Sequence, residues 1–145
     1  MEPPARGKVR FQRRPLGMNW LMVGAVAGGG ALGSVARYFA AGLLGRTFGT
    51  AFPWGTLAVN IVGSFAMGMV VELIALKFSV SQELRAFLAV GVLGGFTTFS
   101  SFSLDTAVLF QRGEFGHAMV YVLASVLGGL FALFAALYLV RQVIA

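Results

Sequence analysis

The sequence has no cysteine, a single histidine and few charged residues, and each shortage excludes a class of function. Disulfides and thiolate metal sites are impossible without cysteine, and His117 alone cannot form a histidine cluster. A nucleophile–base pair of Cys and His cannot be assembled either, so we do not expect an enzyme. Only 11% of the 145 residues are charged, whereas soluble domains carry about 25%. The chain therefore has too little polar surface for a soluble protein.

Apolar residues and glycine take the place of the missing charge. The chain is 58% hydrophobic and contains 20 glycines, and glycine is frequent in membrane helices. Four apolar stretches are each long enough to supply the ~20 residues that cross a bilayer as a helix; they cover residues of about 18–44, 55–76, 84–110 and 117–140. The alternation typical of a membrane β-barrel is absent. We predict an all-α integral membrane protein whose four transmembrane helices form one domain, residues 18–145. A basic N-terminal tail, residues 1–17, precedes it, and we expect this tail to be disordered.

The net charge of +6 is concentrated in this tail. The basic residues before the first apolar stretch are Arg6, Lys8, Arg10, Arg13 and Arg14. Beside a membrane helix, such residues act as a topology signal and contact lipid headgroups. We do not expect nucleic-acid binding, because no basic face with interleaved aromatic residues follows. Since four spans place both termini on one side, the positive-inside rule predicts that both are cytoplasmic.

Two alternatives remain open at the N-terminus. A secretory signal peptide could end at the small residues 25–27, although the helical pattern continues past them to Tyr38. Synthesis could also begin at Met18, which would remove the tail. Three basic residues would then lie on the side of the termini and two on the other side: Lys77, Arg85 and Arg141 against Arg46 and Arg112. So small a bias would let the chain insert in either orientation.

The second apolar stretch carries a polar stripe. Thr56, Asn60 and Ser64 follow one another at steps of four residues, which places them on one face of a helix. Polar groups inside a bilayer are costly unless they are paired, so they are candidates for function. The alternative is an ordinary hydrogen bond between helices, which contributes only about 0.6 kcal/mol.

The middle of the third stretch is poor material for a continuous helix. Gly94 and Gly95 are followed by five hydroxyl residues (Thr97, Thr98, Ser100, Ser101 and Ser103). We therefore predict a helix broken near its middle, which offers free carbonyls to a cation and free N–H groups to an anion. Three phenylalanines at steps of three (Phe96, Phe99 and Phe102) are expected on one face. They either pack against neighbouring helices or turn their positive ring edges toward an anion.

The fourth and first stretches add further donors and close contacts. Tyr121 and Ser125 form an i,i+4 pair of hydroxyl donors, and Gly128 with Gly129 would allow close helix approach. In the first stretch, glycines 29 and 33 lead at steps of four residues to Arg37. This cation either extends toward the headgroups beside Tyr38 or draws anions into a vestibule.

The two carboxylates near the ends of the stretches, Glu72 and Asp105, are expected to be solvated or paired. Together these features describe a narrow path with many hydrogen-bond donors and little formal charge. Such a path suits a small anion that must exchange water for hydrogen bonds and still leave. Four short helices hardly enclose a pore alone, so we infer a homodimer.

Three blocks of sequence resemble the Fluc (CrcB) family of fluoride channels. They are the glycines of residues 28–33 followed by Arg37 and Tyr38, the run PWGTLAVN ending at Asn60, and the run GGFTTFSSFS of residues 94–103. The resemblance extends from about Trp20 to the C-terminus, and the third block is the most specific. Glycine spacing alone would be a weak signal.

The resemblance implies more than the residues show by themselves. It implies an antiparallel, dual-topology homodimer in the cell (inner or plasma) membrane that exports fluoride passively and relieves fluoride toxicity. It also implies a structural Na⁺ at the dimer centre, held by the backbone carbonyls of Gly94 and Thr97. The implied fluoride pathway comprises Asn60, Phe99, Phe102, Tyr121, Ser125, Ser101 and Arg37.

Two departures and two competing functions complete the prediction. Many family members have Thr at Ser101 and Glu at Asp105, so hydroxyl and charge are kept. The basic tail, if translated, opposes dual topology.

A small multidrug-type proton-coupled transporter would need a carboxylate in mid-membrane, and Glu72 sits too near a helix end. A non-transporting membrane assembly protein would need neither Asn60 nor a polar helix break.

Overall fold

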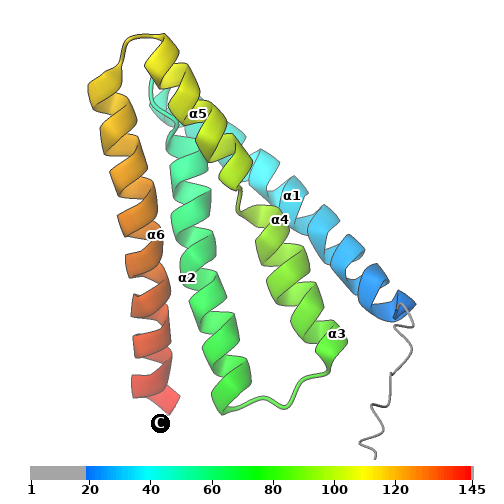
Figure 1. The fold of residues 1–145 in the computed structure, drawn as a ribbon. Helices are drawn as coiled ribbons and strands as arrows, with labels where there is room; N and C mark the ends of the chain where they lie inside the picture. Colours follow the sequence, from blue (N-terminus) through cyan, green and yellow to red (C-terminus); the bar gives the residue numbers. More distant parts are fainter. Residues whose placement is uncertain (1–18, 145) are drawn as a thin grey trace, which may run out of the picture.

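A computed structural model describes residues 19–144, and every regular element in that range is helical. The elements are α1 (Trp20–Phe48), α2 (Trp54–Leu76), α3 (Gln82–Arg85), η1 (Ala86–Leu93), α4 (Gly94–Phe96), α5 (Phe99–Gln111) and α6 (Phe115–Ile144) (Figure 1). The all-α prediction is confirmed for this part of the chain. The basic tail and Met18, on which the topology alternatives depend, lie outside the described residues.

Three helical stretches are long and apolar enough to cross a membrane: Trp54–Leu76, Gln82–Gln111 and Phe115–Ile144. The chain is thus a multi-pass membrane protein. Helix α1 has 29 residues, which is sufficient length, but its glycines, Ser34 and Arg37 make it less apolar. It is the fourth long helix of the expected set, and its membrane crossing stays a prediction.

Several helix ends differ from the expected positions. Helix α1 ends at Phe48 rather than near residue 44, and Gly49 follows it with a φ of 83°, a conformation that favours glycine. Arg46 therefore belongs to the last helical turn. Helix α6 is longer than expected at both ends. The third stretch begins after Ser81, whose hydroxyl accepts a hydrogen bond from the backbone N–H of Leu84.

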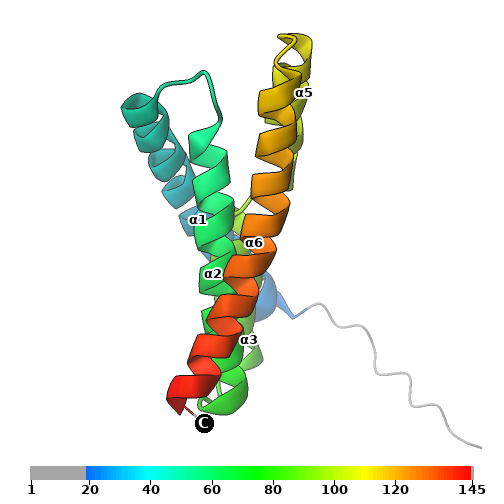
Figure 2. The same cartoon turned by 90° about the vertical axis from the view of Figure 1, so that its left-hand side faces the viewer.

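The helices are arranged as two packed pairs joined by α5. Helices α2 and α6 lie side by side and run in the same direction, while α1 packs against η1 and α4 (Figure 1). Helix α5 then crosses toward the upper part of α6 (Figure 2). The C-terminus and the α2–α3 connection lie at one end of the molecule, and the other two connections lie at the opposite end (Figure 1).

Glycines bring α1 into direct backbone contact with the first half of the third stretch. A Cβ on Gly33 would overlap the carbonyl oxygen of Val92, and one on Gly91 would lie 2.8 Å from the Cα of Gly29. The close contact predicted from the glycine spacing is confirmed. Residues 86–93 of the facing helix form a π-helix, an uncommon conformation that is frequent near functional sites.

Helices α2 and α6 also meet through small residues. A Cβ on Gly68 would lie 2.6 Å from the carbonyl oxygen of Leu133, and one on Gly128 would lie 3.0 Å from Cδ1 of Ile61. Toward the opposite end, a buried cluster of Leu57, Leu109, Ala118 and Tyr121 joins α2, α5 and α6. These contacts fix the walls of the site described next.

Candidate ion pathway

The third stretch is broken at Thr97 and Thr98, as the sequence predicts. Both residues are extended, with ψ of 159° and 119°, between α4 and α5. Helix α5 then restarts with Thr98 as its N-cap, because the Thr98 hydroxyl accepts a hydrogen bond of 3.2 Å from the backbone N–H of Ser101. A new helix N-terminus is thus created inside a membrane-spanning stretch.

Asn60 on α2 satisfies the peptide groups that the break exposes. Its Oδ1 accepts from the N–H of Thr98 at 2.8 Å, and its Nδ2 donates to the carbonyl of Thr98 at 3.1 Å. The interpretation of Asn60 as a bridge between helices is therefore correct. The second hydrogen of Nδ2 has no acceptor among residues 19–144, so the amide keeps one donor for another ligand.

The break also removes the helical donors of the carbonyls of residues 94–97. In a continuous helix, the N–H groups of residues 98–101 would donate to them. Here the N–H of Thr98 donates to Asn60 and that of Ser101 donates to the Thr98 hydroxyl. The four carbonyls that lose these partners include those of Gly94 and Thr97, the two positions expected to hold a cation.

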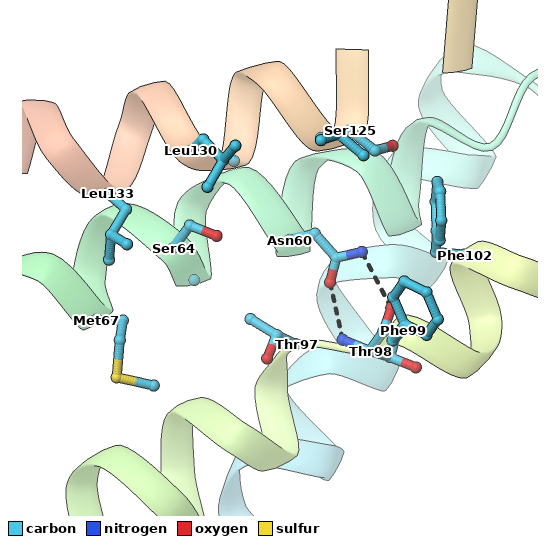
Figure 3. Close-up of a pocket in the computed structure, with 13 residues that line it drawn as sticks. Asn60, Ser64, Met67, Thr97, Thr98, Phe99, Phe102, Ser125, Leu130 and Leu133 are labelled. Carbon is cyan, nitrogen blue, oxygen red and sulfur yellow. Dashed lines mark hydrogen bonds between the residues drawn. The ribbon is translucent and has the colours of Figure 1, made fainter. Parts of the chain in front are cut away.

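A cavity of about 470 Å³ lies beside the break, between α2, α5 and α6 (Figure 3). Asn60 lines it from α2, Phe99 and Phe102 from α5, and Ser125 from α6. The Ser125 Oγ is buried and has no hydrogen-bond partner within residues 19–144. A buried hydroxyl without a partner is costly, and Ser125 is one of the residues that line this cavity.

The aromatic rings do not share one face as the spacing predicts. The rings of Phe99 and Phe102 lie 5.4 Å apart, and Phe102 lies 5.4 Å from Tyr121. Phe96 precedes the break and packs beside Gly63 instead. The prediction of three aligned phenylalanines is wrong, because the extended residues 97–98 end the helical periodicity.

A second cavity of about 400 Å³ lies on the other side of Thr98. Arg37 and Thr56 line it together with Ser101 and Thr98. Arg37 is partly buried there, so its guanidinium stands at the wall of a hydroxyl-lined cavity. This position is compatible with the vestibule role that the sequence left open.

Tyr121 lines neither cavity. It is completely buried, and its hydroxyl donates to Oδ2 of Asp105 at 3.1 Å. Asp105 is thus paired, as expected for a carboxylate in this environment. The roles of Tyr121 and Ser125 in the pathway stay predictions.

Thr98 is the site residue that the sequence did not single out. It caps α5, bonds with Asn60, and lines both cavities. Its hydroxyl also contacts those of Ser100 and Ser101, each at 3.2 Å. The available signal was the residue type: threonine is a preferred N-cap residue, and Thr98 follows shortly after Gly94 and Gly95.

Comparison with known proteins agrees with this picture. Residues 24–137 match the model of the family described as "CrcB-like protein, Camphor Resistance (CrcB)". The chain belongs to this family.

Curated relatives are similar over most of their length. The chain is 60% identical over 116 residues to a protein of Chelativorans sp., an alignment that covers 80% of this chain and 93% of the relative. It is 56% identical over 124 residues to one from Rhodospirillum centenum, covering 86% and 98%. Both relatives carry the name "Fluoride-specific ion channel FluC". The family expected from the three sequence blocks is thereby confirmed.

No group of three or more His, Asp or Glu side chains that could hold a metal occurs in the described part of the chain. A cation at the break of this CrcB-like chain would need backbone oxygens instead. Six of the seven residues expected in the pathway line one of the two cavities, with Thr98 between them, and Tyr121 lines neither.

Proposed function

We propose that this CrcB-like protein is a passive fluoride channel. The observation that carries the proposal is the cavity beside the helix break, which Asn60, with its free amide hydrogen, lines together with Phe99, Phe102 and Ser125. Fluoride is a small and strong hydrogen-bond acceptor, so it would satisfy this donor. Relatives named as fluoride-specific channels support the choice of anion.

The lining provides donors without full positive charge. The Ser125 hydroxyl and the free Nδ2 hydrogen of Asn60 replace part of the hydration of the anion. The edges of Phe99 and Phe102 add weak positive potential. Because neither donor carries a formal charge, the anion is held weakly enough to move on. Arg37, at the wall of the second cavity, raises the local anion concentration.

A second copy of the chain would complete the pathway. Phe99 is 78% exposed, although it lines the cavity, so the cavity is open on one side in a single chain. We propose that an antiparallel copy closes it, which gives a dual-topology homodimer with two pathways. The nearly balanced charges of the described loops are compatible with insertion in either orientation.

The same dimer would explain the carbonyls freed at the break. One chain offers the carbonyls of Gly94 and Thr97, and two are too few to replace the hydration of a cation. Two chains meeting at their breaks would offer four, a set of hard oxygen donors that suits Na⁺. These carbonyls would hold the ion, and its charge would stabilise both helix breaks and the dimer.

Transport through such a path follows the fluoride gradient. A cell that accumulates fluoride would therefore export it through this protein in the cell membrane and relieve fluoride toxicity. Neither competing function gains an observation. Glu72, the carboxylate nearest to the requirement of a proton-coupled transporter, is paired with Arg141 at a helix end.

Fluoride efflux from proteoliposomes tests the proposal. Purified protein should release fluoride rapidly when valinomycin balances the charge, while chloride release stays negligible. A Phe99→Ile variant should lose most of this flux, because an aliphatic side chain has no positive edge. Since Phe99 is exposed in the single chain, the variant should still fold. A folded dimer that passes neither anion would reject the channel.

Replacing sodium tests the cation site. We expect the thermal midpoint of the dimer to fall when Na⁺ is exchanged for the large cation N-methyl-D-glucamine, since four carbonyl dipoles then face one another without a charge between them. Dissociation followed by size exclusion chromatography gives the second readout. An unchanged midpoint and dimer fraction in both salts would exclude a structural Na⁺.

A further inference from the structure

The one buried charged residue in the described part of the chain lies near the C-terminal ends of α2 and α6. Glu72 on α2 is only 5% exposed, and its Oε1 accepts a hydrogen bond from Nε of Arg141 on α6. The side chain of Arg141 is 64% exposed, so it reaches from the surface to a carboxylate held between the helices. Neither residue lines either cavity.

Between this pair and the buried cluster of Leu57, Leu109, Ala118 and Tyr121, α2 and α6 meet mainly through small residues. The two helices run in the same direction, and their closest contacts involve glycines 68, 128 and 129. Gly128 faces Ile61, Gly129 faces Ser64, and Gly68 faces Leu133. Contacts of this kind allow close approach but carry no hydrogen bond or ion pair that is specific for one axial position.

The position of Ser125 relative to Asn60 depends on this axial alignment. Asn60 is fixed on α2 by its two hydrogen bonds to Thr98, whereas the Ser125 hydroxyl has no bond that fixes it. A shift of α6 along α2 would therefore carry Ser125 away from Asn60. An anion that needs both donors is sensitive to such a shift, because donor geometry must hold within about 0.5 Å.

We propose that Glu72 and Arg141 are positioning residues that fix the axial alignment of α6 on α2 and thereby place Ser125 for the anion. A buried carboxylate loses much of its hydration and depends on one partner. The pair is therefore specific for one alignment at its end of α2 and α6, while the buried cluster around Tyr121 lies toward the other end. The inference rests on the proposed fluoride conduction for its transport readout, but the alignment itself can be measured without transport.

The absence of cysteine from the chain gives a clean measurement of alignment. A Cβ on Gly128 would lie 3.4 Å from Cγ1 of Ile61, and neither residue lines a cavity. Ile61→Cys with Gly128→Cys should form a disulfide under mild oxidation. We expect Glu72→Gln to lower the rate of disulfide formation severalfold, because the helices then sample other alignments. Equal rates with and without Glu72→Gln would overturn the proposal.

The transport measurement separates positioning from simple stabilisation. At low protein density, the fraction of vesicles that release fluoride counts folded channels, and the rate in each vesicle measures conduction. We expect Glu72→Gln to reduce the rate per vesicle about tenfold with an unchanged fraction. The disulfide between the two introduced cysteines should restore the rate.

Two matched variants serve as controls. Arg141→Lys keeps the charge and should stay within about twofold of the unmodified rate, while Arg141→Gln should resemble Glu72→Gln. Arg112→Gln changes an exposed arginine that forms no ion pair within residues 19–144 and should have no effect. A smaller fraction of active vesicles with an unchanged rate would overturn the proposal, because the pair would then only stabilise the fold. If the unmodified protein passes no fluoride, the proposed function fails, and the disulfide rates alone decide the alignment.

Discussion

The two halves of the third stretch differ in what holds them and in what they offer. The first half, residues 82–96, packs against α1 through backbone contacts at Gly91 and Gly95. The second half, α5, packs against α6 and carries hydroxyl and aromatic side chains into the cavities. The first half is a scaffold fixed by its backbone, and the second half presents side chains that line the cavities.

The hydroxyls of the polar run also fall into two groups. Thr97 bonds back to the carbonyl of Leu93 at 2.9 Å, and Ser103 bonds back to that of Phe99 at 3.0 Å. These two are satisfied by their own helical segments. Thr98 and Ser101, in contrast, form a cluster at the junction of the halves. The comparison shows that the number of hydroxyls matters less than their place relative to the break.

The largest effect is expected where the two halves are joined. Asn60→Leu keeps the size of the side chain but leaves the N–H and C=O of Thr98 without partners. The barrier for the ion should rise by about 2–3 kcal/mol, which lowers fluoride efflux about a hundredfold. Efflux from proteoliposomes is the measurement. Asn60→Asp keeps the acceptor for Thr98 N–H, so it should fold better yet conduct poorly because of its negative charge. Normal flux in both variants would separate Asn60 from the pathway.

A substitution that forces the first half away from α1 should lower the stability of the protein. Gly33→Ala places a methyl group against the carbonyl oxygen of Val92, so α1 and the first half must move apart. We expect a loss of about 1–3 kcal/mol in the free energy of unfolding, measured by denaturant titration in detergent. Gly28→Ala is the matched control, because a Cβ there meets nothing within 4 Å. If both alanines behaved alike, the backbone contact would not be what fixes the first half.

A smaller effect, confined to transport, is expected at the cavity. Ser125→Ala removes the unpartnered hydroxyl, which should lower fluoride efflux about tenfold and leave the thermal midpoint unchanged or slightly higher. Ser103→Ala removes a hydroxyl of α5 that bonds within its own helix and should leave efflux unchanged. A parallel fall of midpoint and flux in Ser125→Ala would indicate a structural hydroxyl instead.

Much of this fold can be read from local sequence. The apolar stretches predict the helices, and Gly94 and Gly95 with the following hydroxyls predict the break, because hydrophobicity and backbone propensity act over short distances. The glycine spacing in α1 likewise predicts a close contact. The positions of the helix ends are predicted less accurately. Arg46 lies inside α1 rather than in a loop, because the end of a helix depends on the residue that caps it.

What the sequence could not provide is the partner of each polar group. It placed Phe96 with Phe99 and Phe102, but the extended residues of the break turn Phe96 away. It placed Tyr121 and Ser125 on one face of a helix, but it did not show that the Tyr121 hydroxyl bonds to Asp105. Periodicity tells which residues share a helix face, but not what lies opposite that face.

The sequence by itself determined that this is a helical membrane protein with a polar break in its third stretch, and it indicated the family. Only the tertiary structure decided that Asn60 closes the break, that Thr98 stands between two cavities, and that Glu72 meets Arg141. The physical reason is the range of the forces involved. Hydrophobicity and helix propensity act among near neighbours in the chain, whereas a buried polar group must find its partner wherever the fold brings one.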